Sequence, residues 1–528
     1  MFKKQLILIL FFGCNTGLIN SYCQDIKLIP TDQIEIDGAA REINPGDTLK
    51  LEPGLRSNLS FKNLVGTKEK PIVIVNDEEK VIIDTDAHTA ILFENCSFVQ
   101  LTGTGSSDKY GIEIASAGTM GVSVTEFSTN FEIDHLEIHQ TGFAGIMAKT
   151  DPNCDRQDVS EFVMKDLSFH DNYIYDTGGE GFYVGYSWYP TREVDCNDVS
   201  TILYPHPIHE VRIYNNIIKD TGWDGLQVGS SPQNVQLYGN YIENYGIEDR
   251  LYQNHAVQIG AGTTGDFYNN FIYNGTGGGV SFFGSGNNRL FNNIIVGNGE
   301  NAIYHNDKGA EPGTKYQIYN NTIVNPGKGG IDLNASKTNN NLVANNLIVL
   351  GGAVYGITGD GSKWTSEGNQ VYNSVEDVGF KHADTLNFRL TESAKAVDAG
   401  YGISYLNFDF DFNARPANTK YDVGAFELGA EIYVPVLSLE DEEENIVIFP
   451  NPGSGIFNIR MANKITPDSM IISDELGRIV FSKDLTLMKT NDSQINIQTN
   501  LEAGIYLLKI YHGDSELTTR KLMINNRD

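Results

Sequence analysis

The sequence predicts an all-β fold built as a solenoid, and three observations support that class. A phrase of the form Asn-x-Ile recurs, and its seven copies begin at Asn172, Asn216, Asn240, Asn270, Asn293, Asn321 and Asn346. In five copies a Gly or Ala stands nine positions after the Asn. A short strand with alternating apolar residues follows, as in Phe182-Tyr-Val184. A period mostly in the twenties is typical of solenoids, and a period-2 strand in each copy makes this one a β-solenoid.

The charge composition limits the kinds of ligand that the protein is expected to bind. The chain has 528 residues, with 68 acidic and 38 basic side chains and a net charge of −30. Nucleic-acid binding requires a basic face, so this balance argues against it. The same charge disfavours polyanionic ligands in general, although a local basic patch can override the global sign.

The first 23 residues have the features of a secretory signal peptide. Lys3 and Lys4 form a positive end, Leu6–Phe12 is an apolar run, and small residues precede Gln24. The alternative is a lipoprotein in which Cys14 carries the lipid. No later stretch has 18 uninterrupted apolar residues, so we expect no membrane span.

Motifs on both sides of the repeats extend the solenoid. Asn44-Pro-Gly-Asp47 and Asn63-Leu-Val-Gly-Thr67 lie among short strands before it, and Tyr421-Asp-Val-Gly-Ala-Phe-Glu427 closes it. With the Asn-x-Ile phrases, these motifs resemble secreted right-handed parallel β-helix proteins over residues 34–427. The resemblance implies such a β-helix across residues 25–428. Because this scaffold serves lyases, hydrolases, epimerases and adhesins alike, it does not identify an activity.

Three insertions interrupt the regular coils, at residues 150–165, 187–210 and 247–253. The third lets Ala256-Val-Gln-Ile259 take the strand position of its copy. Cys154 lies in the first insertion and Cys196 in the second. We predict a disulfide between them, because an exported protein meets oxidising conditions.

The C-terminal region is a separate small β-domain after an acidic linker at 429–445. Its three blocks are Ile446–Phe457, Ser473–Val480 and Leu501–Lys509. In order and position they resemble the type A C-terminal sorting domain of the type IX secretion system, which would span residues 446–528. The resemblance implies a small β-sandwich and a bacterium of the Bacteroidota kind. It also implies recognition by the type IX machinery and export across the outer membrane, so that the protein is secreted or held at the cell surface.

Stacked coils bring three chemically active side chains together. Neighbouring strands lie about 4.8 Å apart, so equivalent positions form a column. The position before the small residue holds Glu180, Asp224 and His255 in successive coils. Two adjacent carboxylates raise one pKa, and an imidazole can move a proton near neutral pH. We predict these three residues as catalytic. The alternative is structural, because acidic residues before Gly also favour turns.

A second column faces outward beside the first, with polar side chains that suit a long polymer. The predicted substrate-binding residues are Tyr183, Gln227, Gln258, Trp188, Arg250 and Lys149. Trp188 has an alternative role in packing its insertion onto the coils. The Asn of each repeat is predicted to form a hydrogen-bonded ladder, and His305 to pack in the core.

The sequence therefore predicts a polysaccharide-cleaving enzyme, with two mechanisms open. A glycoside hydrolase would use Glu180 and Asp224 as acid and base or nucleophile. A polysaccharide lyase would use His255 or Tyr183 to take a proton, with a cation such as Arg250 or Lys149 to neutralise a uronate. The two acids of the column favour the hydrolase. A non-catalytic glycan-binding or adhesive solenoid is the alternative from another class.

No metal motif or cofactor-binding motif is predicted. A calcium ion is left open, because Asp151, Asp155 and Asp158 lie near one another in the first insertion. Their spacing lacks the glycine turn of a dedicated calcium loop.

Overall fold

The computed structural model describes residues 25–154, 162–361 and 363–429, and the strands of the C-terminal region between 446 and 524. The chain divides into two compact units, residues 1–343 with 348–365, and residues 344–347 with 366–528. The predicted signal peptide and residues 430–445 of the predicted linker lie outside the described residues.

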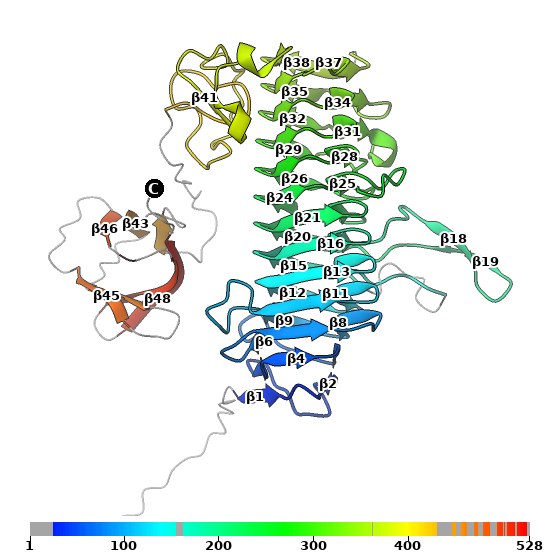
Figure 1. Ribbon diagram of the computed structural model, residues 1–528, viewed down its shortest axis with the longest axis vertical. Coiled ribbons are helices and arrows are strands. Elements are labelled where there is room, and N and C mark those ends of the chain that lie inside the picture. Colours follow the sequence, from blue (N-terminus) through cyan, green and yellow to red (C-terminus); the bar gives the residue numbers. More distant parts are fainter. Residues whose placement is uncertain are drawn as a thin grey trace, which may run out of the picture. The chain divides into compact units, whose positions relative to one another are not determined.

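The first unit is a parallel β-helix in which each coil contributes one strand to each of three sheets. Strands that neighbour one another in a sheet are parallel and come from successive coils (Figure 1). The first sheet contains β1 (Ile26–Ile29), β3 (Thr48–Leu51), β6 (Ile72–Asn76), β9 (Ser97–Thr102), β12 (Thr129–Asp134), β15 (Met164–His170), β20 (Ile208–Tyr214), β23 (Val235–Tyr238), β26 (Gly265–Tyr268), β29 (Arg289–Phe291) and β32 (Gln317–Tyr319).

The other two sheets complete each coil. The second contains β4 (Gly54–Arg56), β7 (Val81–Asp84), β10 (Ile112–Ser116), β13 (Leu136–Thr141), β16 (Tyr173–Thr177), β21 (Ile217–Thr221), β24 (Tyr241–Glu243), β27 (Phe271–Tyr273), β30 (Ile294–Val296) and β33 (Thr322–Val324). The third contains β2 (Glu35–Asp37), β5 (Leu59–Lys62), β8 (Thr89–Glu94), β11 (Met120–Thr125), β14 (Ala144–Ala148), β17 (Phe182–Val184), β22 (Leu226–Val228), β25 (Val257–Ile259), β28 (Val280–Phe282), β31 (Asn301–Asn306), β34 (Gly329–Asn334) and β37 (Tyr355–Gly359). Unit boundaries in the sequence fall near β35 (Asn341–Ala344), β36 (Leu347–Val349) and β38 (Trp364–Glu367).

The repeated Asn forms the predicted ladder inside the coils. The side-chain amide of Asn172 donates to the side-chain oxygen of Asn216 at 3.0 Å, and Asn216 donates to Asn240 at 3.0 Å. The same bond continues through the repeats at Asn270, Asn293 and Asn321. The residue before a ladder position has a positive φ, as at Asn215 (55°), which explains the frequent Asn or Gly there. Each buried amide is therefore bonded along the axis, and the register of one coil fixes that of the next.

The second insertion forms an antiparallel hairpin of β18 (Arg192–Asp195) and β19 (Ser200–Leu203), which projects from the side of the coil stack (Figure 1). The structure joins Cys154 to Cys196 in a disulfide, so the hairpin is tied to the first insertion. The ring of Tyr189 occupies the space that a side chain at Gly262 would need, only 2.5 Å from a Cβ there. The base of the insertion is thus packed on the coils.

The second unit contains short elements and then two antiparallel sheets. The short elements are β39 (Gln370–Tyr372), η3 (Val375–Asp377), β40 (Phe380–His382), η4 (Ala383–Thr385) and β41 (Asn387–Leu390). One later sheet has β42 (Ile446–Phe449), β43 (Ile456–Met461) and β46 (Gln494–Gln498). The other has β45 (Ile479–Asp484), β44 (Ser469–Ser473), β47 (Gly504–His512) and β48 (Ser515–Ile524). Residues of both sheets, including Phe457 and Leu508, share one hydrophobic core, which is the predicted β-sandwich.

The structure contains few helical segments. Among its described residues, the first unit has one short 3-10 helix, η2 (Asp307–Gly309), in addition to its strands. None of the helices in the described part of the chain has the length and apolar character that crossing a membrane requires.

Candidate catalytic site

Glu180, Asp224 and His255 lie side by side in three successive coils. The backbone N–H of Gly181 donates to the carbonyl of Asp224 at 3.2 Å, and that of Gly225 donates to the carbonyl of His255 at 2.9 Å. The three residues precede β17, β22 and β25 in the third sheet, whose registers agree with this alignment. The repeat period therefore brings residues far apart in the sequence to one place.

Asp224 holds the His255 ring in one orientation. Its Oδ1 accepts the backbone N–H of His255 at 2.7 Å and lies 3.2 Å from the ring Nδ1. Asp224 is completely buried, whereas His255 is 9% exposed. With the proton of the neutral ring on Nδ1, facing Asp224, Nε2 carries the lone pair.

The room for this ring depends on Gly278 in the next coil. A Cβ at Gly278 would lie 2.9 Å from Cδ2 of His255. A side chain there would push the imidazole aside, so the glycine is part of the site's geometry.

Glu180 is a buried carboxylic acid beside Asp224. Its side chain is 1% exposed, and its Oε2 has no hydrogen-bond partner among the described residues. Burial, and then the charge of Asp224, raise the pKa of Glu180 to about 8, although the charges of Arg250 and Lys149 counteract them. The carboxyl group therefore stays protonated at neutral pH. The remaining oxygen of Asp224, Oδ2, is also buried and unpartnered among the described residues.

The predicted outward column is a connected polar surface. Tyr183, Gln227 and Gln258 are paired in register across β17, β22 and β25. Gln258 donates its Nε2–H to Oε1 of Gln227 at 2.7 Å, and Gln227 donates to Oγ of Ser187 at 2.9 Å. The Tyr183 hydroxyl lies 2.9 Å from the same Oγ. Ser187 begins the second insertion and was missed by the sequence prediction, because no repeat aligns it with the column.

Lys149 reaches the edge of this surface. Its Nζ lies 4.5 Å from the centroid of the Tyr183 ring and 2.8 Å from Oδ2 of Asp151. Burial lowers the pKa of Lys149, but the attraction of Tyr183 and Asp151 outweighs burial and leaves it raised. Lys149 therefore carries a positive charge in the site.

Arg250 lies on an aromatic cluster that the sequence prediction did not include. Its guanidinium carbon is 3.7 Å from the centroid of the Trp223 ring. Trp223 packs edge-on against Phe143, with ring centroids 5.1 Å apart, and donates its indole N–H to Glu248 at 2.8 Å. Phe143 and Trp223 stand one position before Ala144 and Asp224, in two coils that the coil of Glu180 separates.

Trp188 does not join this group in the described structure. It is 58% exposed, and the guanidinium of Arg192 lies 5.5 Å from its ring. Its predicted contact with substrate stays a prediction.

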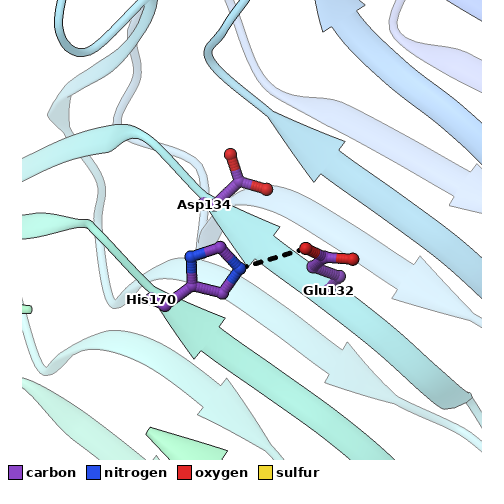
Figure 2. A group of neighbouring side chains, drawn as sticks. All are labelled: Glu132, Asp134 and His170. Carbon is purple, nitrogen blue, oxygen red and sulfur yellow. Dashed lines mark hydrogen bonds and ion pairs between the residues drawn. The ribbon is translucent and has the colours of Figure 1, made fainter. Parts of the chain in front are cut away.

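A further charged cluster lies on the first sheet, away from the predicted columns. Figure 2 shows Glu132, Asp134 and His170, with an ion pair between Glu132 and His170. Nε2 of His170 lies 3.0 Å from Glu132, and Nδ1 lies 2.8 Å from Asp171. These carboxylates overcome the effect of burial and raise the pKa of His170 to about 9. Both ring nitrogens therefore hold protons at neutral pH, and neither offers a lone pair to a metal ion. Of the three aspartates considered for calcium, Asp155 and Asp158 lie outside the described residues.

His305 packs in the core, as predicted. It is completely buried beside Phe282 and Tyr316, with ring centroids 4.6 and 4.0 Å away. Burial lowers its pKa to about 4.

Two family models match parts of the chain. Residues 207–375 match the model of the right handed beta helix region, and residues 447–525 match that of the secretion system C-terminal sorting domain. The solenoid is thus right-handed, as predicted, and the C-terminal region indicates export through type IX secretion. No curated protein sequence matches the chain.

Solved structures with a similar fold include polysaccharide lyases and glycoside hydrolases. The pectate lyase Pel9A is 14% identical, with 76% of this chain and 96% of that chain covered and a TM-score of 0.46. An alginate lyase from Paenibacillus is 16% identical, with coverages of 65% and 96% and a TM-score of 0.36. The catalytic unit of a GH87 alpha-1,3-glucanase from Streptomyces thermodiastaticus is 13% identical, with coverages of 66% and 68% and a TM-score of 0.37. These similarities leave the activity to be argued from the site.

Proposed function

We propose that this chain is a secreted polysaccharide-cleaving enzyme in which His255 transfers the proton. The observation that carries the proposal is the contact of buried Asp224 with both the backbone N–H and the ring Nδ1 of His255. A carboxylate that fixes the tautomer and orientation of an imidazole is the arrangement found at general bases. Asp224 is then a positioning residue, and Nε2 of His255 is the proton acceptor.

Glu180 is the proposed acid of the same site. Cleavage of a glycosidic bond needs a proton on the leaving oxygen, and a carboxyl group with a pKa of about 8 retains one at neutral pH. His255 would take a proton from a water molecule in hydrolysis, or from a sugar carbon in elimination. Glu180 is itself 1% exposed, so this role requires a bound sugar to displace the groups that cover its carboxyl group.

The burial of Asp224 bears on the choice between mechanisms. A hydrolase with Asp224 as nucleophile or base requires its carboxylate to touch the sugar or a water molecule on it. Asp224 is completely buried and is engaged by His255. These contacts disfavour a hydrolase in which Asp224 acts directly, and they favour the more exposed His255 as the group that takes the proton.

The surface beside the site supports a hydroxyl-rich polymer as substrate. Gln258 is half-buried and presents an amide group whose orientation is fixed by its bond to Gln227. Gln227 is only 3% exposed and supports this surface from below through its bond to Ser187, rather than facing a polymer as predicted. Fixed donors and acceptors along a sheet face suit the hydroxyl groups of successive sugars. The second insertion begins at this surface, because Ser187 bonds to Tyr183 and Gln227, and the disulfide ties that insertion to the first.

The test is turnover by the full chain on neutral and acidic polysaccharides, followed by reducing ends and ultraviolet absorbance together. Elimination gives both signals, and hydrolysis gives reducing ends alone. We expect His255→Ala to abolish the product signal and His88→Ala, at an exposed histidine of another coil, to leave it unchanged. Equal turnover by the His255→Ala chain would overturn the assignment. Retention on a polysaccharide gel without any product would support the glycan-binding alternative.

We propose that the C-terminal domain is removed on export across the outer membrane. The match of residues 447–525 to the sorting-domain model supports recognition by the type IX machinery. Mass spectrometry of the exported protein should find a chain without these residues and without residues 1–23. A full-length exported chain would contradict both cleavages.

A further inference from the structure

In the described part of the chain, Arg250 has no anionic partner, although the protein has an excess of acidic residues. The chain carries 68 acidic and 38 basic side chains. Four other arginines of the described structure are paired with a carboxylate, namely Arg212 with Asp166, Arg289 with Asp266, Arg389 with Asp411 and Arg415 with Glu427. Arg56 and Arg192 instead donate to backbone carbonyls and to the Tyr186 hydroxyl. Among the residues that the structure describes, no carboxylate lies within ion-pair distance of the Arg250 guanidinium, which rests on Trp223.

The aromatic cluster holds the guanidinium flat. With its carbon 3.7 Å from the Trp223 ring centroid, the group is stacked on the indole face. Trp223 is itself fixed by Phe143 on one side and by its hydrogen bond to Glu248. A stacked guanidinium keeps its N–H donors at the rim of its plane, which matches the two oxygens of a carboxylate or sulfate group. Arg250 is therefore presented for an anion that the described chain does not supply.

The charge around the site also favours an anion, against the sign of the whole chain. Glu180 is un-ionised at neutral pH and adds no negative charge to the site. Lys149 and Arg250 are both close enough to Glu180 to lower its pKa, and Lys149 is already ion-paired with Asp151. Arg250 is then the cation of the site that no carboxylate of the described residues pairs. The net charge of −30 disfavours polyanions in general, but the local field decides what binds at the site.

We infer that the polysaccharide recognised here is acidic, and that Arg250 binds its carboxylate or sulfate group beside His255. The inference rests on the proposed function, because it places this group in the same site. It makes Arg250 a specificity-determining residue for acidic over neutral sugars. Lys149 is the second cation at the site.

Binding by the full chain with His255→Ala tests the inference without turnover. The probes are an oligouronate, the same oligosaccharide after reduction of its carboxyl groups to alcohols, and a sulfated neutral oligosaccharide. Calorimetric titration should show preference for an acidic probe, and the preference should weaken with added salt. Arg250→Gln should lower affinity for that probe about tenfold and leave the neutral probe almost unaffected. Arg250→Lys should give an intermediate loss, because it keeps the charge without the planar fork.

The matched control is Arg212→Gln, which removes an exposed arginine from the first sheet. Equal affinities for the oligouronate, the sulfated probe and the neutral probe, or equal effects of the Arg250 and Arg212 variants, would overturn the inference. Preference for the oligouronate assigns a carboxylate as the anion, and preference for the sulfated probe assigns a sulfate. Binding that depends on Arg250, in a native chain that releases no product, would defeat the proposed function and leave this inference standing. Cleavage of a neutral polymer that is unchanged in the Arg250→Gln chain would overturn this inference and leave the proposed function standing.

Discussion

The coils from Asn172 to Ile259 and those from Asn270 to Leu333 share one backbone plan but differ in chemistry. The Asn ladder and the parallel registers run through both regions without a break. In the first region the column before the small residue carries Glu180, Asp224 and His255. In the second it carries Gly278, Asn301 and Gly329. The comparison teaches that the scaffold supplies spacing alone, and that side chains at one position supply the chemistry.

Two histidines show that a small change of position along the coil changes the role of a side chain. His255 stands just before its strand, contacts Asp224 and is partly exposed. His305 stands inside its strand, is aligned with Phe282 of the coil before it and is completely buried. A shift of a few positions along the coil therefore turns a candidate base into a core side chain.

The largest effect should come from breaking the contact between Asp224 and His255. Asp224→Asn keeps the shape but replaces the anion that faces Nδ1, so the ring loses its preferred tautomer. We expect kcat to fall by about 10²–10⁴-fold, with little change in thermal stability. Asn301→Ala, at the same position of a later coil, should leave kcat unchanged. Similar kcat values for both variants would show that the two regions do not differ in function.

Glu180→Gln should lower kcat by about 10²-fold and change the pH profile. The raised pKa of about 8 means that the native acid loses its proton, and the enzyme its activity, as the pH passes above 8. The alkaline decline should be absent from the residual activity of the variant. The free energy of unfolding also decreases as the pH rises, because ionising this buried group costs free energy only in the folded state. Native stability should fall as the pH rises from about 4.5 to 8, and a pH-independent difference between native and variant would contradict this.

Gly278→Ala tests the boundary between the two regions. The new Cβ would stand 2.9 Å from the His255 ring and displace it, so we expect kcat to fall about tenfold. Gly361→Ala is the control, because no atom lies within 4 Å of a Cβ there. An unchanged pH profile and kcat in the Gly278 variant would show that the ring position is not critical.

His305→Leu should alter stability rather than activity. Its pKa is lowered to about 4, so the unfolded chain takes up a proton below pH 6.5 while the folded chain does not. Lowering the pH from 7 to 5 should therefore reduce the free energy of unfolding of the native chain by about 2 kcal/mol through this group. The His305→Leu variant should not show this reduction. Urea unfolding at both pH values measures it, with His88→Ala as the exposed control. Parallel pH dependence in native and His305→Leu chains would contradict the buried neutral ring.

The disulfide should have the smallest effect, confined to the coils with insertions. Replacing Cys154 and Cys196 by serine frees the hairpin from the first insertion, and we expect a loss of activity of about threefold through weaker substrate binding. Mass mapping of the unreduced exported protein should find the two cysteines linked and Cys96 as the free thiol. Alkylation of both Cys154 and Cys196 without reduction would rule out the bond.

Much of the site could be predicted because the solenoid converts sequence period into spatial alignment. The spacing from Asn172 and Asn216 to the following glycines was enough to place Glu180 beside Asp224. Ser187 and Trp223 could not be predicted in the same way. Ser187 lies on an insertion whose path does not repeat. The role of Trp223 is visible only from its contact with Arg250, which belongs to another insertion.

The right hand of the solenoid was implied by the resemblance to secreted β-helix proteins. The sequence by itself determined the β-solenoid, the small C-terminal β-domain and the alignment of the three candidate catalytic residues. Those features follow from local rules: alternation within strands, left-handed turn residues and a period that each coil repeats. Only the tertiary structure decided that Asp224 is buried and contacts His255, that Glu180 keeps its proton, and that Arg250 lies on Trp223 with no ion pair among the described residues. Burial and charge depend on every group that surrounds an atom, and those groups come from coils and insertions that the sequence separates.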